Sequence, residues 1–303
     1  MPPQGQPQSS LTGPPGSDES LFPAAWQPLT PSGVAAFAFS SGRRLLIVQS
    51  IVAILSVSVL LAVLHHAAVP LVQKAVQQLP DEGVIVHRNL VTPLTNVTLL
   101  AESRVLAVVA DAPGYGMTGL RSDFRIWFRQ REVAVCSVFG CMAVRYPRNW
   151  EVSFNRREVQ PAMEAWIPFV DAGIALVHLA SLFLAWTFLA TVFCPIPLLV
   201  ARYSDRALSW RGSWRLAGAA LMPGALLATA GLAAYGYGLI SLVQLLIVAV
   251  LHLMLGWLYL VLAPLSLPRR EAVEQALNPF STPDAPLPPP EDSPRNHNPF
   301  ASS

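Results

Sequence analysis

The chain has 303 residues, of which 53% are hydrophobic and only 13% are charged. Soluble globular domains carry about 25% charged residues, so this composition excludes an ordinary soluble protein. The net charge of +2 is too small to indicate nucleic acid as a partner. Because the polar residues are concentrated at the two ends and between about residues 66 and 165, the apolar residues form uninterrupted blocks, as a multi-pass membrane protein requires.

The two ends of the chain are rich in proline. Residues 1–42 contain eight prolines together with many Gly, Ser and Gln, a composition that buries too little apolar area to offset the entropy of ordering. Residues 269–303 are similar, and residues 278–280 and 298–300 repeat the tripeptide Asn-Pro-Phe, which we interpret as a chance match in a biased sequence. We expect both segments to be disordered tails.

The first apolar block predicts one membrane span over residues 43–65. Its residues 45–64 contain no charge, and as a helix they are about 30 Å long, which matches the hydrocarbon core of a bilayer. A cleaved signal peptide is disfavoured, because the polar leader and the apolar run are both too long for one.

Two further blocks predict three more spans. Residues 166–200 form the second span, and the sequence Cys-Pro-Ile-Pro at 194–197 is expected to end or kink its helix. Residues 216–268 contain no charged side chain and are too long for one crossing. They predict a hairpin of two helices that reverses at Tyr235-Gly236-Tyr237-Gly238, where glycine permits a tight turn and tyrosine suits the membrane interface.

Short basic segments predict the orientation of the spans. Their arginines are Arg43, Arg44, Arg202, Arg206, Arg211, Arg215, Arg269 and Arg270. Basic residues in short loops favour the cytoplasmic side, so both tails and the basic loop at 201–215 are expected there. The chain is then a multi-pass protein of the plasma membrane, that is, the bacterial inner membrane, with residues 66–165 on the far side.

Residues 66–165 predict a small α+β domain outside the membrane. Apolar residues at Val69, Val72, Val76 and Leu79 favour a stalk helix, in which Pro70 either kinks a continuous helix or begins a new one. Strands are expected at residues 84–87, 97–100, 105–110, 124–128, 133–138 and 142–146. The expected fold is a four-span helical bundle with a mainly antiparallel, extracytoplasmic α+β domain.

Cys136 and Cys141 are separated by the four residues Ser-Val-Phe-Gly in this exterior domain. An oxidising exterior permits a disulfide, and a turn at Phe139-Gly140 would let the two side chains meet, whereas a single strand would direct them apart. A disulfide and two buried free thiols both remain open. A metal or redox site is disfavoured, because no histidine or third cysteine is near in sequence.

Asp171, His178 and His252 are ionisable residues within predicted spans, and such residues are costly to bury in lipid and therefore suggest function. Asp171 and His178 are two helical turns apart and share a face, and both histidines are predicted near the membrane midplane. They form either a proton relay or polar solute path, or a structural contact of neutral histidines between helices.

No catalytic constellation, cofactor motif or metal-ligand spacing is evident in the sequence. The pattern favours a non-enzymatic envelope protein that binds, senses or scaffolds, with the lipid bilayer and another envelope protein as its partners. The alternative is a component of a small-solute or proton-coupled transport system that uses the Asp/His residues.

One architectural resemblance adds to this interpretation. A first span, Leu79-Pro80 after a stalk helix, an Asp-x-x-Gly turn at Asp111 and Gly114, and three clustered spans resemble an uncharacterised bacterial membrane family, some members of which bear the name maltodextrin-utilisation protein. The resemblance covers about residues 40 to 270 and excludes the tails. It implies the same topology and no catalytic residues.

Overall fold

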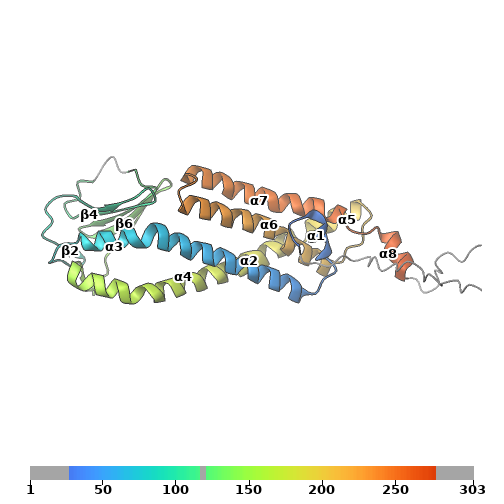
Figure 1. Ribbon diagram of the computed structural model, residues 1–303, viewed down its shortest axis with the longest axis horizontal. Coiled ribbons are helices and arrows are strands. Elements are labelled where there is room, and N and C mark those ends of the chain that lie inside the picture. Colours follow the sequence, from blue (N-terminus) through green and yellow to red (C-terminus); the bar gives the residue numbers. More distant parts are fainter. Residues whose placement is uncertain (1–26, 117–120, 278–303) are drawn as a thin grey trace, which may run out of the picture.

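A computed structural model of the protein describes residues 27–116 and 121–277. It is an elongated molecule, with a helical bundle that continues at one end into a small β-containing domain (Figure 1). Four helices among the described residues are long and apolar enough to cross a membrane: Gly42–Gln77, Arg156–Tyr203, Trp210–Gly236 and Leu242–Leu265. The prediction of four apolar spans is confirmed at this level of length and composition.

The first spanning helix and the stalk form one continuous helical rod. Helix α2 (Gly42–Val63) passes through a π-helical turn, η1 (Leu64–Ala68), into α3 (Val69–Gln77). Proline lacks a backbone donor, and its ring clashes with the carbonyl four residues earlier, here that of His66. The wider π turn directly before Pro70 accommodates this clash, so the rod continues without a break.

The second candidate spanning helix, α4 (Arg156–Phe193), is longer than one membrane crossing requires. Its 38 residues correspond to about 57 Å, roughly twice the thickness of the hydrocarbon core. The side chain of Asn155 caps its start by accepting a hydrogen bond from the amide of Glu158 at 3.0 Å. The helix breaks at Cys194 before α5 (Pro195–Tyr203), as the Cys-Pro-Ile-Pro sequence predicts.

Helices α6 (Trp210–Gly236) and α7 (Leu242–Leu265) form the predicted hairpin. Of the most apolar part of α6, 56% is buried within the protein, compared with 11% of that of α7. Close contact explains the small residues of α6: a Cβ added to Gly224 would lie 2.5 Å from the backbone oxygen of His252. Helix α6 is therefore the centre of the bundle.

The domain contains two sheets. The first has the order β2-β1-β8 and consists of β1 (Val84–Val86), β2 (Asn89–Val91) and β8 (Val152–Ser153). The second has the order β3-β4-β5-β6-β7 and consists of β3 (Thr98–Glu102), β4 (Leu106–Asp111), β5 (Phe124–Arg129), β6 (Glu132–Ser137) and β7 (Gly140–Arg145). Among the strands of the described residues, only β4 and β5 pair in parallel, so the antiparallel-rich sheet is confirmed. Strands β2 and β8, of three and two residues, were not predicted, because neither has an apolar run like Val84–Val86 of β1.

Helix α3 packs on β3 and β4 and closes the core of the domain. Leu71 and Ala75 of this helix are buried against Leu100, Val108 and other apolar residues of the sheets. The stalk predicted from helical spacing is thus an integral part of the domain.

The Asp-x-x-Gly turn lies at the end of β4. Asp111 is 1% exposed, and its carboxylate accepts hydrogen bonds from the amides of Gly114, Tyr115 and Gly116 at 2.9, 3.1 and 2.9 Å. Gly114 and Gly116 have φ of 78° and 74°, the left-handed region that glycine adopts readily. The acid and the glycines together therefore specify this turn.

The prediction of disorder is wrong for the last part of residues 1–42 and the first part of residues 269–303. Helix α1 (Pro31–Ala36) contacts α7, and Val34 and Phe37 are fully buried. Helix α8 (Arg270–Leu277) continues the chain after α7. The rest of both predicted tails, including the Asn-Pro-Phe tripeptides, lies outside the described residues.

The predicted basic loop at 201–215 is mostly helical. It includes the end of α5 and the first turns of α6, separated by a short turn around Asp205. Arg202, Arg211 and Arg215 therefore lie in helices, and Arg206 lies in the short turn between α5 and α6.

Candidate functional site

Asp171 of α4 pairs with His65 of η1. The Nε2 atom of His65 lies 2.8 Å from Oδ2 of Asp171, and the two side chains are 49% and 23% exposed. The π turn that precedes Pro70 contains His65. Sequence reasoning assigned Asp171 to a group with the two span histidines and missed His65, which lies 106 positions away.

His178 and His252 line one cavity inside the bundle. The cavity has a volume of about 320 Å³ and is enclosed by residues of α2, α4, α6 and α7. His178 Nε2 lies 3.0 Å from the hydroxyl of Ser56 on α2. Nδ1 of His252 is buried and has no hydrogen-bond partner within residues 27–116 and 121–277. The cavity thus presents one paired and one unpaired imidazole.

The structure therefore divides the predicted Asp/His group into two parts. Asp171 lies two helical turns from His178 and bonds to His65, whereas both histidines face the internal cavity. A neutral imidazole carries one donor and one acceptor nitrogen, so the two histidines place polar groups in a mostly apolar lining. No signal in the sequence relates Ser56 to His178, because the contact depends on how α2 packs on α4.

Arg104 links the β-domain to the turn between α6 and α7, in addition to the continuous helices α2–α3 and α4. Its guanidinium donates to the carbonyl oxygens of Tyr235 at 2.5 Å, Ile240 at 2.9 Å and Gly238 at 3.4 Å. The Tyr235 hydroxyl in turn donates to the carboxylate of Asp123 at 2.8 Å. These contacts seat the edge of the β-domain on the turn between α6 and α7.

Cys136 and Cys141 lie directly opposite each other across the hairpin of β6 and β7. Their sulfur atoms are 2.01 Å apart and their α carbons 4.0 Å apart, so the structure contains a disulfide here. Gly140 has φ of 123° and allows the tight reversal. Of the two alternatives that the sequence left open, the geometry is that of the disulfide.

The eight arginines used to predict orientation lie in segments at the end of the bundle opposite the β-domain: the start of α2, the α5 to α6 region and the end of α7 (Figure 1). Two of them also hold the fold together. Arg206 donates to the carbonyl of Leu267 at 2.5 Å, and Arg215 donates to the carbonyl of Ala38 at 2.8 Å. These two arginines therefore also satisfy backbone carbonyl groups just after the ends of α7 and α1.

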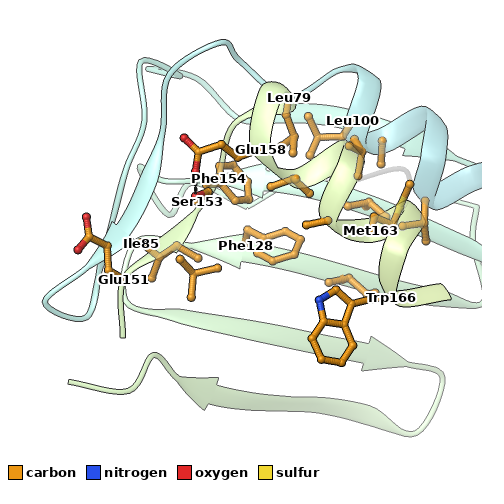
Figure 2. A pocket seen from close by; sticks show the side chains of 18 residues that line it. Leu79, Ile85, Leu100, Phe128, Glu151, Ser153, Phe154, Glu158, Met163 and Trp166 are labelled. Carbon is orange, nitrogen blue, oxygen red and sulfur yellow. Dashed lines mark hydrogen bonds between the residues drawn. The ribbon is translucent and has the colours of Figure 1, made fainter. Parts of the chain in front are cut away.

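An apolar cavity lies in the β-domain, between α3, the start of α4 and the two sheets. Its volume is about 670 Å³, within the range of about 300 to 1,000 Å³ that is usual for small-molecule sites. Eighteen residues line it, and the polar ones are Glu151, Ser153 and Glu158. Figure 2 shows Glu151 and Ser153 on one side of the cavity and Met163 and Trp166 on the other.

Sequence reasoning did not find this cavity. Its walls come from α3, β1, β3, β4, β5, β8 and α4, and each wall shows only the apolar pattern of an ordinary core. A cavity of this kind is a property of how the elements are spaced, which periodicity alone does not reveal.

In comparisons with protein-family models, curated proteins and solved structures, nothing matches this chain. Function must therefore be inferred from the geometry of the chain itself.

Proposed function

We propose that the chain is a non-enzymatic protein of the plasma membrane that binds or senses an envelope component through its exterior β-domain. Both termini lie in the cytoplasm, and the bundle anchors the domain and responds to its state. The observation that carries this proposal is the contact of Arg104 with the turn between α6 and α7. Through these hydrogen bonds, a change in the position of the domain would act directly on the hairpin.

The orientation is supported by two features at opposite ends of the molecule. The basic segments lie at the end of the bundle remote from the β-domain (Figure 1), and short basic segments favour the cytoplasm. The Cys136–Cys141 disulfide lies in the β-domain, and disulfides persist in oxidising compartments.

Site-specific photo-crosslinking in intact cells of the native host tests the binding function. A photoreactive p-benzoylphenylalanine replaces Tyr115 or Phe139, which are 81% and 75% exposed on the β-domain. We expect discrete crosslinked products from these positions. The matched control is Tyr203, 91% exposed at the opposite end of the bundle.

Products that form equally from Tyr203, or no product from the domain positions, would contradict the proposal. The same cells report expression of the full-length protein, so a variant that fails to fold is recognised before its crosslinking is compared.

A second candidate function is transport, and the internal cavity favours it. His178 and His252 line the same space, and the buried Nδ1 of His252 lacks a hydrogen-bond partner among the described residues, so the cavity brings together two imidazoles that no structural contact between them explains. In this function the domain would gate access to the bundle.

Proton flux into proteoliposomes, followed with an enclosed pH-sensitive dye under an imposed potassium potential, tests transport. His178→Ala and His252→Ala should abolish flux, whereas His66→Ala, whose ring lies against Tyr237 at the end of the hairpin, should leave it intact. Equal flux in all variants would exclude the two histidines from a proton path.

A further inference from the structure

The cavity of the β-domain has a definite polarity along the axis of the molecule. Helix α4 begins at the far end of the domain and runs toward the bundle (Figure 1). Glu158, in its first turn, is therefore farther from the bundle than Met163 and Trp166. The polar lining residues are thus at the outer end of the cavity, and the end nearer the membrane is lined by apolar side chains.

The inner end of the cavity is continuous with the lipid-facing surface of α4. Ala162 and Trp166 line the cavity, and Phe169, one turn further along the same face, is 69% exposed. Residues four and three positions apart fall on one stripe of a helix, so this stripe runs from the spanning part of α4 directly into the cavity. An apolar chain that follows it stays in contact with apolar side chains throughout.

This arrangement matches the orientation of a lipid in the outer leaflet. There the headgroup points away from the membrane and the acyl chain points toward the midplane. A molecule that is lifted outward along α4 without turning over would bring its chain into the apolar part of the cavity and its headgroup to the outer, polar end.

We propose that this cavity binds the acyl chain of a single-chain amphiphile taken from the outer leaflet. This inference rests on the proposed function, since it requires the β-domain to lie outside the membrane, and it names the ligand class of that domain. The volume of about 670 Å³ and the almost wholly apolar lining suit one long chain and no large polar group.

The charge at the outer end restricts the headgroup. Glu151 and Glu158 line it together with Ser153, whose hydroxyl donates to the carboxylate of Glu158. Carboxylates repel a second negative charge and attract an ammonium group. The site therefore favours an amphiphile with an amine or an uncharged headgroup over one that is only anionic.

Photolabelling of the purified full-length protein in detergent micelles tests the site. The probe is palmitoyl lysophosphatidylethanolamine with a diazirine near the end of its chain, and the labelled peptides are located by mass spectrometry. We expect labelling to concentrate on the peptide of α4 that contains Met163 and Trp166.

Ala162→Trp fills the cavity and should lower this labelling by at least about tenfold, the effect of roughly 1.4 kcal/mol of lost binding. Ala165→Trp is the matched control, since Ala165 is also exposed on α4 but does not line the cavity. Labelling that is spread evenly over α4 and α7 and is equal in both variants would overturn the proposal.

The headgroup is tested with palmitoyl lysophosphatidylglycerol, which is anionic. It should label the wild-type peptide several-fold less than the ethanolamine probe, and Glu151→Gln or Glu158→Gln should reduce this preference. Glu164→Gln, whose side chain accepts from Gln160 outside the cavity, should not change it. Equal labelling by both probes in the wild type would remove the headgroup assignment.

This result is separable from the proposed function. Discrete crosslinks from Tyr115 or Phe139 in cells, without cavity labelling, would leave a binding protein whose ligand is not an amphiphile. Cavity labelling without such crosslinks would establish the amphiphile site and contradict a protein partner for the exposed face.

Discussion

The guanidinium of Arg104 donates to the backbone carbonyl of Tyr235 at 2.5 Å, although 131 positions separate the two residues. The carbonyl groups in the last turn of a helix have no partner within the helix and carry partial negative charge. A cation placed there satisfies them, and here the cation belongs to another domain. The β-domain therefore caps α6, and a displacement of the domain would expose the end of that helix.

Removing this cap should loosen the turn between α6 and α7. Hydrogen bonds to a charged group contribute about 1.5 to 3 kcal/mol, so Arg104→Ala should speed amide exchange of residues 237–241 by about tenfold or more. Hydrogen exchange followed by mass spectrometry measures this. Arg121→Ala, at an exposed position of the same domain, is the control, and equal exchange in both variants would show that Arg104 does not hold the turn.

A methyl group at Gly224 should disrupt the packing of α6 on α7. The added Cβ would lie 2.5 Å from the backbone oxygen of His252, whereas a Cβ at Gly173 of α4 meets no atom within 4 Å. Overpacking costs about 1 to 3 kcal/mol, while glycine to alanine in an open helix position stabilises by about 0.5 to 1 kcal/mol. Thermal unfolding in detergent should show Gly224→Ala destabilised and Gly173→Ala unchanged or stabilised.

The spans and the turn between α6 and α7 were predictable because both depend on local composition. An uninterrupted apolar block of sufficient length indicates a spanning helix, and Gly236 and Gly238 mark the best position for a reversal within the block at residues 216–268. The larger strands followed from alternation in the same way. The stretch around Val34 and Phe37 was missed because it is only a few residues long and lies among prolines, so its burial depends on the bundle that it contacts.

The candidate site could be predicted only in part. Asp171, His178 and His252 were recognised because a polar residue inside an apolar block is conspicuous, but their partners were not. Helix packing selects His65 for Asp171 and Ser56 for His178, and no spacing in the sequence encodes either pair. In the sequence, Arg104 is an ordinary polar residue between two predicted strands. Nothing there relates it to the turn between α6 and α7.

The Cys136–Cys141 disulfide should contribute measurable stability to the β-domain. It closes a loop of six residues, for which the chain-entropy relation gives about 2 kcal/mol. The Cys141→Ser variant should have a lower unfolding midpoint than the wild type. Added reductant should lower the midpoint of the wild type but not that of the variant. If reductant shifts both equally, the bond does not account for the difference.

The thiol count gives an independent check of the same bond. The chain has three cysteines, and Cys194 is free and buried. Protein denatured without reductant should therefore bind one equivalent of maleimide, and reduced protein three. Three equivalents without reductant, from protein purified under non-reducing conditions, would show that the pair is not bonded in the cell.

Labelling from the two sides of the membrane tests the orientation on which the proposed function depends. Leu239, in the turn between α6 and α7, is 78% exposed, and Tyr203, at the other end of the bundle, is 91% exposed. With the basic segments in the cytoplasm, a membrane-impermeant maleimide should label Leu239→Cys in intact cells and Tyr203→Cys only after the membrane is opened. Both are made in a Cys194→Ser background, so that the engineered thiol is the one that reacts. The reverse pattern would place the β-domain in the cytoplasm, where a stable disulfide is not expected, and would remove the outer leaflet as the source of its ligand.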